Sequence, residues 1–176
     1  MANVDLSRVP QYYHKYINLV SSKELQNGFD QYPSEFINFL QSIPEEKWDF
    51  RYQEDKWSIK EMVQHIMDTE RIFCYRALCF ARKDKTPLPG FDENEYARNA
   101  MADVRSKDEL VSELVTIQSS TALLFKSFTE EMLNEEGVAN GKSVYVKGIG
   151  FIILGHSQHH KGILIERYLK EKTISL

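Results

Sequence analysis

Three Ser-x-x-Glu sequences, each followed by apolar residues at helical spacing, constrain the fold of this chain more than any other feature. They are "SSKE" from Ser21 to Glu24, "SIKE" from Ser58 to Glu61 and "SKDE" from Ser106 to Glu109. In such a capping box the serine and glutamate side chains each accept a hydrogen bond from a backbone N–H that a helix start leaves free. The boxes therefore predict helices over residues 21–43, 58–81 and 106–128.

The rest of the chain supplies one more long helix and a turn. Apolar residues recur at helical spacing again over residues 147–170, which predicts a fourth helix. Pro33 lies inside the first predicted helix and should kink or divide it, because proline removes a backbone hydrogen bond. "TEEML" fits an extra turn after the third helix. The Asn-Gly pair in "ANGKSVYV", beside alternating valine and tyrosine, favours a small hairpin or an extended loop.

Four long helices without a substantial sheet predict an all-α fold, a four-helix bundle. The connection over residues 82–105 holds two prolines and a glycine in "KTPLPGFDENEY", which excludes one continuous helix there. It is also much longer than the few residues that join antiparallel neighbours. We therefore expect a long crossover that leaves the second and third long helices parallel. No repeat or flexible linker divides residues 1–176, so we expect a single domain.

Composition narrows the classes of function. The chain has 176 residues, of which 42% are hydrophobic and 27% charged, as in an ordinary globular protein, and no window resembles a membrane span. The formal net charge of -4 leaves no basic stripe, so we expect no nucleic-acid partner. The N-terminal residues lack a signal or transit pattern, which favours the cytoplasm. Cys74 and Cys79 fall on separate faces of one predicted helix and are read as reduced, buried thiols.

Three of the five histidines lie in "GHSQHHKG" near the C-terminus. At about 100° per residue, His156 and His160 lie about 40° apart on a predominantly apolar face of the predicted helix. His159 falls about 100° away and is expected to face solvent or to support a ligand. Two histidines at i and i+4 can bind one metal ion, as in H-E-x-x-H helices, although the glutamate of that motif is missing. Many such pairs are only surface or capping residues.

His65 is the candidate third ligand, at the edge of a wide apolar face of the helix over residues 58–81. Glu61, Asp68 and Arg76 share its direction, so the same polar line fits a salt-bridged helix flank with a satisfied histidine, and the two interpretations stay open. Three imidazoles from two helices would leave an open position for water or substrate, which is typical of catalytic metal sites.

Nitrogen ligands suit zinc, nickel, copper or iron(II) and do not identify the metal. Asp68 or Glu61 is a candidate to orient a ligating imidazole, and Arg76 or Arg167 a candidate for an anionic substrate group. No nucleophile or general base stands out, so the catalytic residues stay unknown. His14 has no evident partner and is expected at the surface.

Three blocks, "KWSIKEMVQHIMDTERIFCYRALCFAR", "TPLPGFDENEY" and "FIILGHSQHHKGILIERYL", occur in an order that resembles the DinB/YfiT-like superfamily of bacterial proteins. The resemblance covers residues 25–169. It implies a four-helix bundle with a crossover between the second and third helices, a homodimer, and a metal held by one histidine of the second helix and two of the last. Residue by residue, this pattern places the ligands at His65, His156 and His160.

The resemblance implies a metal-dependent enzyme, either a hydrolase or an S-transferase that uses a low-molecular-weight thiol, acting on a small-molecule substrate. The divalent ion could be zinc, nickel or iron, with the thiol as a cosubstrate. The alternative is a non-catalytic metal-binding stress-response or ligand-binding protein, in which the ion mainly fixes the bundle. Fold analogy alone does not decide between them.

Overall fold

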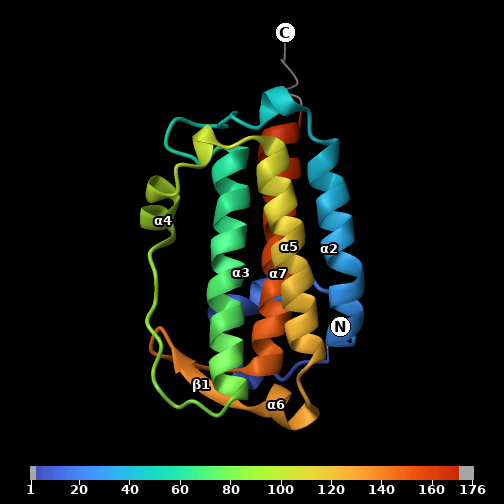
Figure 1. Cartoon of the computed structure of the whole chain (residues 1–176), viewed down its shortest axis with the longest axis vertical. Coiled ribbons are helices and arrows are strands. Elements are labelled where there is room, and N and C mark those ends of the chain that lie inside the picture. Colours follow the sequence, from blue (N-terminus) through green and yellow to red (C-terminus); the bar gives the residue numbers. More distant parts are fainter. Residues whose placement is uncertain (1–2, 171–176) are drawn as a thin grey trace.

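A computed structural model describes residues 3–170 of the chain and shows four long helices packed as a bundle (Figure 1). The helices and strands, in chain order, are α1 His14–Ile17, α2 Leu25–Ser42, α3 Ile59–Ala81, α4 Glu93–Asn99, α5 Lys107–Lys126, α6 Glu130–Asn134, β1 Glu136–Ala139, β2 Lys142–Tyr145 and α7 Val146–Ile163. A π-helical turn, Leu164–Leu169, continues α7. None of the helices in the described part of the chain is both long and apolar enough to cross a membrane.

Two of the three predicted capping boxes form, at the starts of α3 and α5. The hydroxyl of Ser58 accepts from the backbone N–H of Glu61, whose carboxylate accepts from the N–H of Ser58. Ser106 and Glu109 make the same reciprocal pair. Because each box satisfies two donors that the first turn leaves free, both helices begin where the sequence predicts.

The predicted capping box at Ser21 is wrong. α2 begins at Leu25, with Glu24 at its N-cap and no side-chain cap. The backbone N–H and the hydroxyl of Ser21 instead lie 2.8 and 2.9 Å from the hydroxyl of Tyr32. A tertiary contact with a buried tyrosine thus replaces the local one. Of the kink or division predicted at Pro33, the division is wrong, since α2 runs unbroken through this residue.

The crossover has the predicted effect on topology. α3 and α5 run in the same direction, and the connection between them, which contains α4, climbs back along the outside of the bundle (Figure 1). α3 packs against α5 and α7, and α2 packs against the same two helices. The bundle therefore has two parallel pairs of neighbours, α3 with α5 and α2 with α7, as predicted for a fold with one long crossover.

The predicted hairpin joins the crossover to the base of the bundle. β1 and β2 pair antiparallel around Asn140 and Gly141, which both have positive φ angles of 50° and 68°. An Asn-Gly pair tolerates this left-handed turn better than other residues. Leu88 of the crossover pairs with the outer side of β1, through its N–H to Val138 O at 2.9 Å and its carbonyl to Asn140 N at 3.0 Å. The hairpin thereby fixes the path of the crossover.

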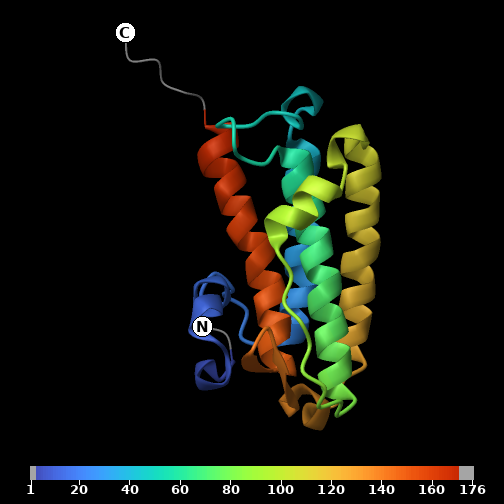
Figure 2. The ribbon, with the colours of Figure 1, turned by 90° about the vertical axis from the view of Figure 1, so that its left-hand side faces the viewer.

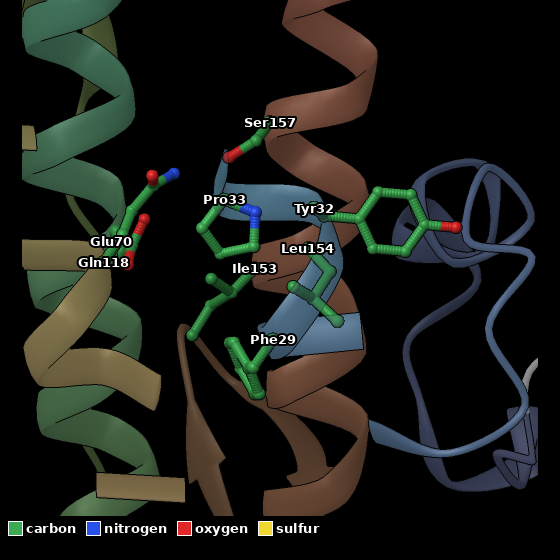
Figure 3. Close-up of a pocket in the computed structure, with 8 residues that line it drawn as sticks. All are labelled: Phe29, Tyr32, Pro33, Glu70, Gln118, Ile153, Leu154 and Ser157. Carbon is green, nitrogen blue, oxygen red and sulfur yellow. The ribbon is translucent and has the colours of Figure 1, made fainter. Parts of the chain in front are cut away.

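A layer of buried polar side chains separates two hydrophobic clusters in the bundle. On α7, Ile153 belongs to one cluster and Leu164 to the other. α3 and α5 likewise contribute residues to both clusters. The buried polar side chains between the clusters are His65, Thr69, Glu70, Gln118, Thr121, His156, Ser157 and His160. Figure 3 shows one part of this layer, in which Glu70, Gln118 and Ser157 border a small void beside Pro33 of α2.

Candidate metal centre

Three of the polar-layer side chains converge on one point. The Nε2 atom of His156 lies 3.2 Å from Nε2 of His65 and 3.0 Å from Nε2 of His160. All three histidines are buried, and one ligand atom from each lies within 4.8 Å of the others. His65 comes from α3 and the other two from successive turns of α7. The structure therefore brings together the three residues that the sequence singled out.

The spacing of these nitrogen atoms fits binding to one shared metal ion. Metal–nitrogen bonds of about 2.1 Å place two ligand atoms about 3.4 Å apart in tetrahedral geometry and about 3.0 Å apart in octahedral geometry. The two Nε2–Nε2 separations, 3.0 and 3.2 Å, fall in this range. Hydrogen bonding within the cluster is a poorer explanation, because the single Nε2 lone pair of His156 cannot accept from both neighbours. A cation would accept all three lone pairs.

Burial keeps the three imidazoles in their neutral form. It lowers the pKa of His65 from 6.5 to about 4. It also holds the pKa values of His156 and His160 well below the ordinary value, with a smaller contribution from the other histidines. The neutral imidazole is the form that binds a metal. The three histidines therefore do not have to release protons before they can bind a metal ion at neutral pH.

The rings are held in place by neighbours that the sequence did not identify. Thr69 Oγ1 lies 3.5 Å from Nδ1 of His65, so the second nitrogen of this imidazole has a polar partner. The indole of Trp57 packs on His65 with ring centres 4.7 Å apart, and Tyr16 packs edge-on against His156 at 5.6 Å. Nδ1 of His160 is buried and has no partner among the described residues.

The two carboxylates proposed to orient an imidazole do not do so. Glu61 caps α3 and pairs with Arg51. Asp68 accepts from Gln64 at 2.9 Å and faces Arg71. Both belong to the salt-bridged flank that the sequence offered as the alternative interpretation of this helix face. The alternative is thus correct for the acidic residues, whereas His65 points into the bundle.

A cleft of about 810 Å³ opens over the three histidines. Its walls come from the N-terminal segment, α3, the crossover, the hairpin and α7. In Figure 2 the N-terminal segment lies to the left of α7 and the crossover to its right. The volume is typical of a small-molecule site, and six aromatic side chains, Tyr12, Tyr13, Tyr16, Trp57, Phe73 and Phe91, line it.

The other candidate residues divide between cleft and surface. Arg76 is buried and lines the cleft, as the hypothesis of an anion-binding residue requires. Arg167 donates to the hydroxyl of Tyr52 at 3.0 Å and does not line the cleft. His159 is half-buried at the cleft wall, with its ring against Tyr16. The prediction for His14 is wrong, because its Nε2 lies about 3 Å from the carbonyl oxygens of Leu6 and Val9 in a half-buried position.

The N-terminal wall of the cleft could not be read from helical periodicity. Residues 10–16 form short turns that pack on α7, and Gly155 makes this contact possible. A Cβ atom at Gly155 would lie 2.1 Å from the carbonyl oxygen of Tyr16, which no side chain tolerates. The dense aromatic run "QYYHKY" and the glycine before His156 are the only sequence signals of this wall. Cys74 and Cys79 are unbridged and half-buried, and neither lines the cleft.

The fold, the crossover and the histidine cluster define a helical-bundle protein with a candidate metal centre, and sequence comparison identifies its family. The model of the DinB superfamily matches residues 29–164. The chain belongs to the DinB superfamily.

Two bacterial relatives are similar over most of their length. One is OB0413 of Oceanobacillus iheyensis, named as an inferred metal-dependent hydrolase, which is 25% identical over 134 residues, covering 74% of this chain and 76% of the relative. The other is GK0616 of Geobacillus kaustophilus, named in the same way, at 24% identity over 132 residues and 73% of each chain.

Solved structures show the same fold. YfiT from Bacillus subtilis, described as an inferred metal-dependent hydrolase with an unusual four-helix bundle topology, superposes with a TM-score of 0.68 at 13% identity, over 94% of this chain and 91% of that chain. A mycothiol-dependent maleylpyruvate isomerase superposes with a TM-score of 0.65 at 13% identity, over 90% of this chain but 62% of that chain. At this identity the likeness confirms the bundle fold alone.

Proposed function

We propose that this protein is a metal-dependent enzyme, a hydrolase or a low-molecular-weight-thiol S-transferase, in which His65, His156 and His160 hold one divalent ion. The observation that carries the proposal is the convergence of three neutral, buried imidazoles beneath a cleft of about 810 Å³. A site built only for stability would be closed by a fourth protein ligand. Here the described residues offer no fourth His, Cys, Asp or Glu to the cluster.

The chain's own residues have defined roles in this proposal. Thr69 orients His65, and Trp57 and Tyr16 hold the rings of His65 and His156 by packing. The aromatic walls of the cleft limit the water around a bound substrate. A bound divalent ion would supply Lewis-acid chemistry, since it lowers the pKa of a coordinated water or thiol. The names of the two bacterial relatives support hydrolysis, whereas the thiol cosubstrate rests on the resemblance alone.

The test is turnover by protein reconstituted with zinc, nickel or iron(II). p-Nitrophenyl esters report hydrolysis, and chlorodinitrobenzene with cysteine reports thiol transfer. We expect one of the two reactions to depend on the metal and to be lost in His160→Ala. Retention of that turnover by metal-free protein would contradict the proposal. Bound metal without turnover or saturable thiol binding would instead favour the non-catalytic alternative, with the ion fixing α3 to α7.

The homodimer and the cytoplasmic location stay predictions. Sedimentation equilibrium of the metal-loaded protein would measure the first.

A further inference from the structure

Arg76 is a buried cation that has no acidic partner within the described part of the chain. Only 4% of the residue is exposed, and among residues 3–170 it makes no ion pair. One guanidinium N–H donates to the carbonyl oxygen of Pro89 at 2.8 Å. A guanidinium has five N–H donors, and an arginine removed from water normally pairs with an anion. Burial lowers the pKa of Arg76, although the group stays charged in proteins.

The position of the guanidinium is fixed from two sides. The Pro89 carbonyl belongs to the crossover, whose path is set by the pairing of Leu88 with β1. The guanidinium carbon also lies 5.3 Å from the ring centre of Phe73, one turn earlier on α3. Since a helical side chain leans toward the N-terminus of its helix, this contact turns Arg76 along α3 in the direction of His65. The charge is therefore held in place before any ligand arrives.

Arg76 shares one face of α3 with the candidate metal centre. His65, Thr69, Phe73 and Arg76 follow one another at helical spacings of four, four and three residues, and all four line the cleft. The helix rises about 16 Å from His65 to Arg76, at about 1.5 Å per residue. Because the long arginine side chain leans back along α3, a molecule that reaches from the histidines to the guanidinium is shorter than this rise, on the order of 10 Å.

The other charges around the cleft are at its rim. Lys15, Lys142 and Glu93 line the cleft with exposed side chains. Lys15 lies over the rings of Tyr12 and Tyr16. Rim charges are well solvated and contribute little, whereas a buried guanidinium discriminates strongly between an anion and a neutral group.

We infer that Arg76 binds the carboxylate of an elongated substrate whose apolar middle lies against the aromatic wall and whose opposite end reaches the three histidines. The inference rests on the proposed function for that opposite end only. It names the substrate class as a small carboxylic acid with an apolar or aromatic segment, which a planar guanidinium can bind through two parallel hydrogen bonds.

The test uses 4-phenylbutyrate and its uncharged analogue 4-phenylbutyramide as probes. Binding is measured by NMR chemical-shift titration on metal-free protein at about pH 8, where histidine is neutral. We expect wild type to prefer the carboxylate by roughly tenfold or more, the factor given by one charge-assisted hydrogen bond. Arg76→Gln should abolish this preference and leave the affinity for the amide unchanged. The rim control Lys15→Gln should retain it.

Equal affinity of wild type for the two probes, no binding of either, or a carboxylate preference that persists in Arg76→Gln would overturn the inference. If Arg76→Gln folds poorly, Arg76→Lys replaces it in the test. The lysine variant keeps the charge and is expected to show part of the wild-type preference for the carboxylate. Elemental analysis of the same wild-type protein after reconstitution tests the proposed function separately. Absence of metal would contradict that function, while the probe comparison would still decide on Arg76.

Discussion

Replacement of Glu70 by glutamine should stabilise the protein at neutral pH. Glu70 is 4% exposed in the polar layer, and burial raises the pKa of its carboxyl from 4.5 to about 7 (Figure 3). The hydrogen bond with Thr121 and the charge of Arg71 lower this pKa in part, but burial outweighs both. Thr121 Oγ1 lies 2.6 Å from Glu70 Oε1, 3.0 Å from the Ile117 carbonyl oxygen and 3.2 Å from Cys74 Sγ. A neutral Glu70 can donate to Thr121, whose single proton then goes to Ile117.

The sign and size of the stability change follow from the coupling between protonation and folding. Between pH 4.5 and about 7 the folded chain keeps the Glu70 proton that the unfolded chain has lost. The contribution of the neutral group is therefore complete below pH 4.5 and is lost as the pH rises to about 7. A pKa of about 7 in place of 4.5 corresponds to about 3 kcal/mol, which is an upper value for a site that can relax. Glutamine is neutral throughout and avoids this loss.

Urea unfolding of chelator-treated protein, followed by circular dichroism at several pH values, measures the effect. We expect Glu70→Gln and wild type to differ little near pH 4.5, and the variant to be more stable by up to about 3 kcal/mol above pH 7. The difference between the two proteins cancels the titration of the histidines. Glu113→Gln is the control, because Glu113 pairs with Arg71 and Arg105 and its pKa is lowered. A stability difference for Glu70→Gln that does not change with pH would refute the reasoning.

Two further predictions concern stability. Gly155→Ala should destabilise by about 1–3 kcal/mol, because the added Cβ forces the Tyr16 backbone away from α7. The control Gly162→Ala, on the same helix with nothing within 4 Å, should stabilise by about 0.5–1 kcal/mol, and equal effects at the two glycines would contradict the contact. Ser106→Ala should cost about 1 kcal/mol through loss of the α5 cap. The exposed Ser119→Ala on α5 should cost nothing, so a similar loss there would argue against a capping effect. Thermal melts measure all four variants.

Local chemistry explains which parts of the fold could be predicted from the sequence. The boxes at Ser58 and Ser106 each depend on residues three apart, and the Asn-Gly turn depends on two neighbours, so no distant contact competes. Ser21 has the same pattern, but it forms a hydrogen bond with the hydroxyl of Tyr32 in place of a helix cap. Pro33 stays helical because the rest of α2 buries its apolar face in both clusters. Periodicity therefore predicted the long helices and missed what tertiary contacts decide.

The candidate site also has a part that could be predicted from the sequence and a part that could not. The direction of His156 and His160 along α7 follows from helix geometry, and their meeting with His65 follows from the family pattern. Asp68 shares the face of His65, but the nearby Gln64 and Arg71 satisfy it locally. The cleft walls come from the N-terminal turns and the crossover, whose positions depend on contacts between distant segments. No periodic signal describes such contacts.

The most direct test of the metal centre is elemental analysis of protein purified without a histidine tag. We expect close to one divalent ion per chain in wild type after reconstitution with zinc, nickel or iron(II), and its loss in His65→Ala. His159→Ala is the control, because His159 lies on the same helix and in the same cleft but outside the cluster. It should keep the ion. Wild type without metal, or His65→Ala with as much metal as wild type, would contradict a shared site on α3 and α7.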